Sequence, residues 1–257
     1  LKQPRASLAA IQTLARPLYL PLSRDFASIP TPAVSNCTQL QAKLLEWGDK
    51  AGSAANSYRF TLACPSAGGR YDDCSRPPQS GAQLPAIIRV SGASSLTLEA
   101  DAGCATGEGR PRLSAAGPDD AYDPDVRARL VVATGPKARV TVKSLILDGR
   151  GVRPGLYLEN AGRASLENTD LRGFVAAKCD AYPSWRSGCG GALVAYATQV
   201  VLKGVVFEGN MAAYRAYDET EPMKAGLGGA VFAGEGGLVL IGQGASCTQG
   251  VQSRAKP

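Results

Sequence analysis

The sequence predicts an all-β fold in which short strands wind into stacked coils, as in a solenoid. A repeat is the first sign of this fold: the 12 residues 138–149 recur 24 residues later at 162–173, and a further 36 residues later at 198–209. Each copy is small or apolar at its third and fifth places, apolar at its tenth, and Gly at its last. Residues 94–99 and 236–241 resemble an earlier and a later copy. Self-similarity of this period is typical of repeat architectures.

Alternation within each copy is the second sign. In Val140-Thr141-Val142-Lys143 the apolar side chains point one way and the polar ones the other, as in a strand with one buried face. Three such strands per unit of about two dozen residues close by winding into coils ~4.8 Å apart. We therefore expect Val142, Leu166 and Leu202 to lie in vertical register. A Gly-rich β-sandwich also has short strands and turns, but it does not require an internal repeat.

A pair of near-identical motifs adds a resemblance. Gly190-Gly191-Ala192-Leu193 and Gly228-Gly229-Ala230-Val231 flank Phe207-Glu208-Gly209-Asn210. These segments resemble the Gly-Gly-Ala-Ile and Phe-x-x-Asn repeats of the polymorphic outer membrane protein family of chlamydiae. The resemblance implies a right-handed parallel β-helix (solenoid) of the pectin-lyase-like kind and an adhesive, surface-exposed role. The chain departs from the family in having two copies of the first motif and one of the second.

The organisation along the chain follows from these patterns and from the prolines. We expect an extended, Pro-rich arm, then a segment with a helix, a first strand and a Cys-bearing loop, then the coils, then a tail. The boundaries are 1–35, 36–86, 87–245 and 246–257.

The two ends of the coils are predicted to differ. Residues 38–49 read as an amphipathic N-terminal capping helix that covers the first strand edges, with Leu40, Leu44, Leu45 and Trp47 near one face. The first strand is expected at Tyr58–Leu62. No amphipathic helix follows residues 238–241, so this coil invites another chain to pair with it.

Composition agrees with one core and limits the partners. Apolar residues make up 44% of the 257 residues, aromatics 6%, and 30 residues are Gly, which suits a narrow aliphatic core. The net charge is +6. Lys2, Arg5, Arg16 and Arg24 precede the first acid and form a basic arm. We expect this arm to be solvated and predict no nucleic-acid partner, because the sequence shows no concentrated basic patch interleaved with aromatics. A surface that favours acidic glycans remains open.

No membrane span is expected, because no apolar run approaches about 18 residues. The sequence starts without a charged segment followed by an apolar one, so we expect a leader that has been removed or a longer parent chain.

Seven cysteines and the absence of His direct the chemistry. No Cys-x-x-Cys pair occurs, so the usual zinc sites are excluded, and we predict no metal and no cofactor. Most cysteines lie beside Gly, Pro, Asp or Ser, which favours disulfides and an extracellular or cell-surface location over buried thiols in the cytosol. The pairs Cys179–Cys189 and Cys64–Cys74 are predicted. Cys37 pairs with Cys104 or another cysteine, and one of the seven stays unmatched. Asn36-Cys37-Thr38 is a glycosylation sequon at Asn36.

Catalysis without His leaves carboxylates as the candidates. Asp148 with Arg150 and Asp170 with Arg172 are assigned equivalent places in successive copies, and Glu208 takes the next such place. Two carboxylates one coil apart can share a cation or flank a glycosidic bond. The alternative is that they are solvated turn residues in weak ion pairs. The acidic segment 119–125 is either a Ca²⁺ loop or, lacking the Gly and closing Glu of an EF-hand, an exposed loop.

Aromatic residues suggest a binding surface. Tyr182 and Trp185 lie between Cys179 and Cys189, and three more tyrosines follow within two coils. Tyr and Trp on exposed loops anchor partners or sugar rings, although Trp185 can equally pack its own loop. The three further tyrosines are Tyr196, Tyr214 and Tyr217.

The sequence therefore favours an extracellular structural or adhesive module over an enzyme. We expect it to assemble with other chains, or with copies of itself, through loops and an open C-terminal end. The alternative is a polysaccharide lyase or hydrolase that acts on an acidic glycan. An enzyme requires a groove where carboxylates and Arg or Lys converge.

Overall fold

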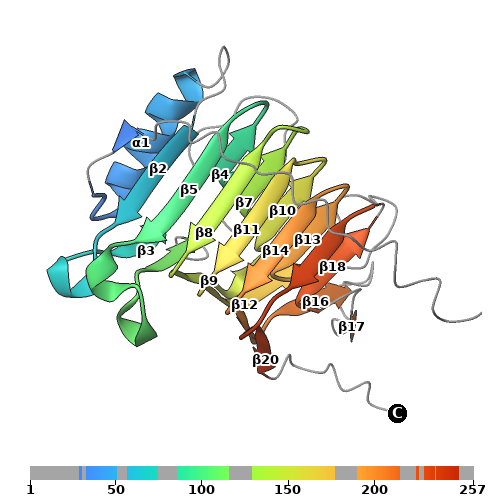
Figure 1. The fold of residues 1–257 in the computed structure, drawn as a ribbon. Helices are drawn as coiled ribbons and strands as arrows, with labels where there is room; N and C mark the ends of the chain where they lie inside the picture. Colours follow the sequence, from blue (N-terminus) through green and yellow to red (C-terminus); the bar gives the residue numbers. More distant parts are fainter. Residues whose placement is uncertain are drawn as a thin grey trace, which may run out of the picture.

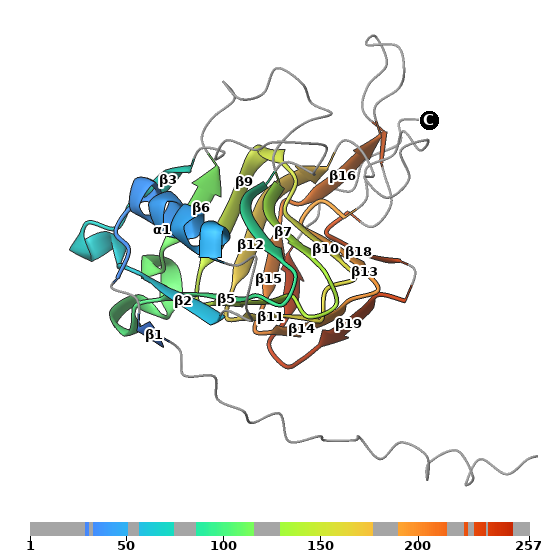
Figure 2. The ribbon, with the colours of Figure 1, turned by 90° about the horizontal axis from the view of Figure 1, so that it is seen from above.

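Three parallel β-sheets stack side by side and enclose one core (Figures 1 and 2). A computed structural model of the chain describes residues 29–30, 33–50, 57–74, 86–115, 129–176, 190–214, 224–225, 229–234 and 236–248. All pairings among the named strands are parallel except that of β16 with β17.

The first sheet orders seven strands as β1-β2-β5-β8-β11-β14-β19: Ile29–Pro30, Ser57–Leu62, Ser95–Ala100, Arg139–Lys143, Arg163–Glu167, Gln199–Lys203 and Leu238–Ile241. The second sheet orders β4-β7-β10-β13-β18: Ala86–Ser91, Arg129–Thr134, Leu156–Glu159, Leu193–Tyr196 and Val231–Gly234. The third sheet comprises β3 Tyr71–Cys74, β6 Arg112–Ala115, β9 Ile146–Arg153, β12 Asp170–Ala176, β15 Val206–Glu208, β16 Met211–Tyr214, β17 Lys224–Ala225 and β20 Ser246–Thr248.

Successive coils add strands to the three sheets in the same order along the chain. The strands β7, β8 and β9 are followed by β10, β11 and β12, which lie directly on them. This stacking confirms the solenoid that the repeat predicts.

The core column is a row of apolar residues in register on the first sheet. Leu166 pairs with Val142 on one side and with Leu202 on the other, as the repeat predicts. The predicted earlier and later copies also pair in register, through Leu98 and Ile241. In order, the core column is Phe60, Leu98, Val142, Leu166, Leu202 and Ile241.

A left-handed turn recurs where the coils of the three aligned copies pass from the first sheet to the third. Ser144, Asn168 and Gly204 occupy it with φ of 55°, 49° and 58°. Asn tolerates this conformation and Gly adopts it freely, whereas most side chains are strained there. These turns repeat at the same spacing as the strands, so the chain bends at the same place in each of the three copies.

The two motifs of the resemblance also stack. Leu193 pairs with Val231, and the N–H groups of Gly191 and Ala192 donate to the carbonyls of Gly229 and Ala230, so the described residues of the two Gly-Gly-Ala segments lie one on the other. A Cβ at Gly191 would lie 2.5 Å from the Met211 carbonyl oxygen and 2.7 Å from that of Gly229, so only Gly fits this approach. Asn210 is 2% exposed, and its amide accepts from the Phe174 N–H at 2.9 Å and donates to the Leu171 carbonyl at 2.7 Å. Asn210 thus satisfies two buried backbone groups of the preceding coil.

The helix α1, Cys37–Lys50, lies against the β2–β3 end of the stack, which we call the first end (Figures 1 and 2). Asn36 precedes it, and its side-chain oxygen accepts from the Gln39 N–H at 2.9 Å, which satisfies a free donor of the first turn. Leu40 is fully buried in the core and Leu44 packs against it. Leu45, which the sequence places near the same face, is 49% exposed, because it is one residue further round the helix than Leu44.

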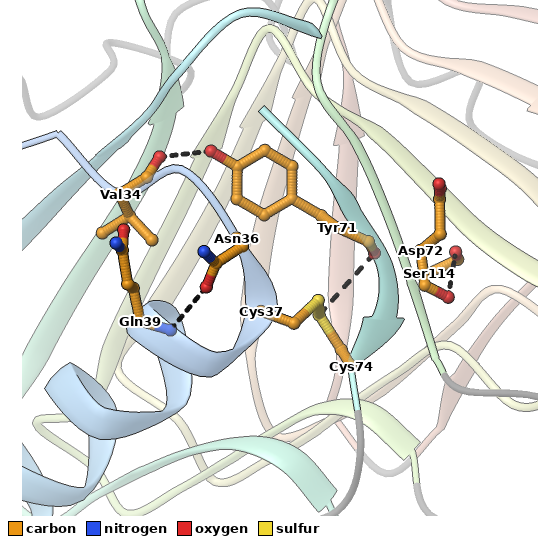
Figure 3. Close-up of a disulfide and its surroundings, with 8 residues drawn as sticks. All are labelled: Val34, Asn36, Cys37, Gln39, Tyr71, Asp72, Cys74 and Ser114. Carbon is orange, nitrogen blue, oxygen red and sulfur yellow. Dashed lines mark hydrogen bonds between the residues drawn. A yellow bond between two sulfur atoms is a disulfide. The ribbon is translucent and has the colours of Figure 1, made fainter. Parts of the chain in front are cut away.

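Two disulfides tie the first end together. Cys37 of α1 bonds Cys74 at the end of β3, with Cα atoms 4.9 Å apart (Figure 3), and Cys64 bonds Cys104, with Cα atoms 5.7 Å apart. The predicted Cys64–Cys74 pair is wrong. Cys64 follows β2 of the first sheet, whereas Cys74 ends β3 of the third, so residues close in sequence lie on different faces.

Several predictions fall on segments outside the described residues. These are the Cys179–Cys189 bridge, Tyr182, Trp185, Tyr217, the acidic segment 119–125 and most of the 1–35 arm. The side chains of Trp47, Tyr214 and Cys247 are also outside the described part of the chain.

Candidate functional site

A charged groove runs over the outer face of the third sheet. Along β6, β9 and β12, Leu113, Leu147 and Leu171 are fully buried and their neighbours in sequence face outward, as strand alternation requires. The outward residues border a hollow of about 590 Å³. We call this hollow the charged groove; it is lined by Asp72, Arg112, Asp148, Arg150, Arg172, Glu208 and the glycines 151, 173 and 209.

The strand register corrects the predicted stacking of carboxylates. Asp148 lies in register with Arg172, not with Asp170, and Arg172 lies in register with Glu208. Asp170 instead pairs with Ile146, two places earlier. The row across the coils therefore alternates acid, base and acid, so neighbouring groups attract one another instead of forming a pair of carboxylates.

Asp148 is 5% exposed and has both side-chain oxygens engaged. Its Oδ2 accepts from Nε and Nη2 of Arg112 at 2.9 and 2.5 Å, and its Oδ1 accepts from the Arg150 N–H at 2.9 Å. Arg150 has a φ of 51°, and a register shift follows where β9 pairs with β12. Asp148 thus holds together a bulged strand, and the bulge leaves the Arg150 side chain exposed at the groove.

Asp170 is 3% exposed and lies between two guanidinium groups. Its Oδ2 accepts from Nη2 of Arg110 at 2.7 Å and from Nη2 of Arg172 at 2.6 Å. Arg110 is fixed further by donating to the Asn168 and Gly107 carbonyls, each at 2.7 Å. The two cations offset the cost of burying the Asp170 carboxylate. Removal of either arginine would leave part of that desolvation cost without compensation and would destabilise the fold.

Arg172 joins the buried and exposed parts of this network. Its Nη2 also donates to Glu108 at 3.0 Å, and its Nε lies 3.2 Å from a Glu208 oxygen. The hydrogen bond to Glu108 raises the pKa of Arg172, and the same bond lowers the pKa of Glu108. Glu208 is an accessible carboxylate of the groove, with a side chain that is 54% exposed, and Asp72 is exposed as well.

The charged groove therefore brings together four of the five predicted catalytic candidates: Asp148, Arg150, Arg172 and Glu208. Asp170 does not line it but is linked to it through Arg172. Chemically, the exposed charged groups of the groove are the carboxylates of Asp72 and Glu208 and the guanidinium groups of Arg112 and Arg150, which suit binding of a polar ligand. In the described part of the chain, no three Cys, Asp or Glu side chains gather as metal ligands.

The last coil, β18 with β19 and β20, is a second candidate site. Of the four large apolar side chains that are exposed in the described residues, three belong to β19: Leu238 at 50%, Leu240 at 42% and Ile241 at 71%. Ile241 is the last residue of the core column, where Leu202 and the four residues before it are at most 1% exposed. The core thus opens to solvent at this coil.

The predicted aromatic binding surface is wrong at Tyr196. Tyr196 is 4% exposed and lies between Tyr157 and Phe232, with ring centroids 6.0 and 5.7 Å apart. Arg129 stacks over Tyr157 at 5.0 Å. The aromatics form a ladder on the second sheet, whose strands β7, β10 and β13 are mostly buried on both faces, so Tyr196 is a packing residue.

The structure also bears on the glycosylation sequon, the compartment and the membrane. Asn36 caps α1 through its side-chain oxygen, and the amide nitrogen that a glycan would occupy takes no part in that bond. Two disulfides indicate an oxidising, non-cytosolic compartment. Among the helices of the described residues, none is long and apolar enough to span a bilayer.

Comparison with known proteins gave no match to a family model, to a curated protein or to a solved structure.

Proposed function

We propose that the protein is an extracellular structural or adhesive module, a right-handed parallel β-helix closed at its first end by α1, that assembles through its last coil. The observation that carries the proposal is the exposure of Ile241, at 71%, at the end of an otherwise buried core column. Exposed apolar side chains beside unpaired strand edges are typical of interaction surfaces. The resemblance of residues 190–231 to the polymorphic outer membrane protein-type repeats, which implies an adhesive role, is a second reason for the proposal.

The sequence of β19 supports assembly. The strands β2, β5, β8, β11 and β14 of the same sheet each carry at least one charged residue, whereas Leu238–Ile241 carries none. Charged residues on edge strands keep other chains from adding to a sheet. Their absence from β19 leaves both its backbone edge and its side chains suited to pairing.

The partner that fits best is a second copy of the chain, joined last coil to last coil. The helix α1 lies over the first end, so stacking of a last coil on the first end of another copy is obstructed. An uncharged apolar surface is complementary to itself, and a two-fold contact buries it on both copies at once. Such a contact closes, and it gives a dimer with antiparallel pairing across the interface.

The test is the mass in solution of the wild-type chain and of two Leu→Lys variants, measured by light scattering over a concentration series. Leu240→Lys places a charge on the last coil, and Leu45→Lys places one on an equally apolar, 49% exposed site of α1. We expect dimers for the wild type and Leu45→Lys, and monomers for Leu240→Lys with an unchanged circular dichroism spectrum.

A monomeric wild type with slowly exchanging amides at residues 238–241 would contradict assembly through this coil. A monomeric wild type that binds another protein through the same residues, lost in Leu240→Lys, would replace the second copy by that partner.

The charged groove favours a second candidate, cleavage of an acidic glycan. Glu208 and the Arg150 guanidinium are accessible there, in a groove of about 590 Å³. Against it, both oxygens of Asp148 are held by Arg112 and the Arg150 N–H, so the buried carboxylate has no oxygen left to take a substrate proton. Release of reducing ends or unsaturated sugars from polygalacturonate, abolished by Glu208→Gln but not by Glu159→Gln, would establish this activity.

A further inference from the structure

A basic hollow lies on the outer face of the first sheet, away from the charged groove and from the last coil. It encloses about 660 Å³ across β5, β8 and β11. Four cationic residues border it, Lys137, Arg139, Lys143 and Arg163, against one acid, Glu167. Hydroxyl groups of Ser95, Thr141 and Ser165 line the space between them.

One row of charges on this face is compensated. Glu99, Lys143, Glu167 and Lys203 lie in register on successive strands, so acid and base alternate. Lys143 and Glu167 form an ion pair at 3.4 Å. Alternation of this kind is what cross-strand pairing favours.

A second row on the same face is not compensated. Arg139 lies in register with Arg163, and the places on either side of this pair are Ser95 and Gln199. Both arginines are exposed, and neither has an ion pair within the described residues. Like charges directly opposite each other on neighbouring strands are destabilising, so this arrangement lacks a structural reason. Lys137, in the turn before β8, adds a third cation to the same side of the hollow.

We propose that the basic hollow binds an acidic polysaccharide, with a sulfate or carboxylate group bridging Arg139 and Arg163. Neighbouring strands are ~4.8 Å apart, close enough for one anionic group to accept hydrogen bonds from both guanidinium groups. The hydroxyl groups of Ser95, Thr141 and Ser165 are suited to sugar hydroxyls. The residues lining the hollow include no aromatic ring, so it offers no platform for stacking nucleobases. The proposal is independent of assembly through the last coil.

The experiment is fluorescence anisotropy of a labelled heparin hexasaccharide and of a labelled oligogalacturonate, titrated with the folded chain at 0.15 M salt, about physiological strength. The test variant is Arg139→Gln/Arg163→Gln. The matched control is Arg59→Gln/Lys203→Gln, which removes the same charge from the same sheet outside the hollow. Labelled single-stranded DNA and neutral dextran complete the set.

We expect at least one acidic oligosaccharide to bind, the test variant to lose about tenfold or more in affinity, and the control to lose less than about threefold. Thermal melting of the test variant should be unchanged or slightly higher, because it removes a repulsion. The two probes distinguish sulfate from carboxylate as the preferred group. Absence of binding to both acidic probes would overturn the proposal. Equal losses of affinity in the test and control variants would mean that the attraction is non-specific and would overturn the site. DNA that binds as tightly, and loses as much affinity in the test variant, would overturn the glycan as the ligand.

Discussion

The core column is buried at one end of the stack and exposed at the other. At the first end, Phe60 is 1% exposed, α1 buries Leu40, and two disulfides join the helix and the first strands. At the last coil, Ile241 is 71% exposed on a strand without charge. In a solenoid each interior coil is covered by its two neighbours, whereas each terminal coil lacks one neighbour and has to be covered in another way. The comparison teaches that the repeated interior determines the fold, whereas the two ends differ in how far they bury the same core column.

Removal of both disulfides should have the largest effect. The Cys64–Cys104 bridge closes a separation of 40 residues, and the loop-closure model gives about 4 kcal/mol for a loop of this size. A chain with Ala at Cys37, Cys64, Cys74 and Cys104 should therefore lose about 4–8 kcal/mol in the free energy of unfolding. Urea unfolding, with and without a reductant, measures this loss. Equal stability of the oxidised and reduced wild type would show that the first end does not depend on these bridges.

Truncation of one apolar side chain at each end sharpens the comparison. Leu40→Ala creates a cavity under α1 and should cost about 2–5 kcal/mol. Ile241→Ala removes a mostly exposed side chain and should cost less than about 1 kcal/mol, measured at a concentration low enough for the monomer. If both variants lose the same amount in urea unfolding, the last coil is covered by the chain itself and the contrast between the ends disappears.

Asn210→Ala tests how the later coils hold to those before them. Asn210 satisfies the Phe174 N–H and the Leu171 carbonyl of the preceding coil, and both are buried. Its loss leaves them without a partner, at a cost of about 1–3 kcal/mol. Hydrogen exchange should speed up near Leu171 and Phe174 and in β18–β20 before it does so at the first end. Asn168→Gly is the matched control, since it keeps the left-handed turn and should cost little.

The repeat makes the core predictable, because a shift of 24 or 36 residues aligns apolar places without knowledge of the fold. The same alignment puts Asp148 opposite Arg172 and Arg139 opposite Arg163, but matching the acids by residue type instead of by place misses both pairs. Strict counting from Gly149 and Gly173 finds the alternating row and the two opposed arginines.

Other features cannot be found in this way. Cys64 and Cys74 are ten residues apart, but a coil carries them to different faces, so nearness in sequence does not imply contact. Tyr196 is buried because the second sheet is covered on both faces, and a strand of four residues gives no sign of what lies outside it. Contacts between different sheets of the stack depend on the path of the loops that join the strands, and a short sequence pattern does not indicate that path.

The last prediction concerns the ionisation of Tyr71, at the first end, as the pH becomes alkaline. Burial raises the pKa of Tyr71 to about 12, and its hydroxyl donates to the Val34 carbonyl beside α1 (Figure 3). In the unfolded chain this hydroxyl ionises near about pH 10. Between the two values the unfolded state binds fewer protons, so the stabilisation is complete below about pH 10 and is lost as the pH rises toward 12.

Tyr71→Phe separates this contribution from those of the other tyrosines and of the lysines. The difference in the free energy of unfolding between wild type and Tyr71→Phe should be about 1 kcal/mol at pH 8, from the lost hydrogen bond. Above about pH 10 it should shrink, with a slope below about 1.4 kcal/mol per pH unit. Urea unfolding at about pH 8, 9.5, 10.5 and 11, values that span the ordinary ionisation range of tyrosine, measures it. A difference that stays constant through about pH 11 would mean that Tyr71 ionises equally easily in both states, and that α1 does not shield this end from water.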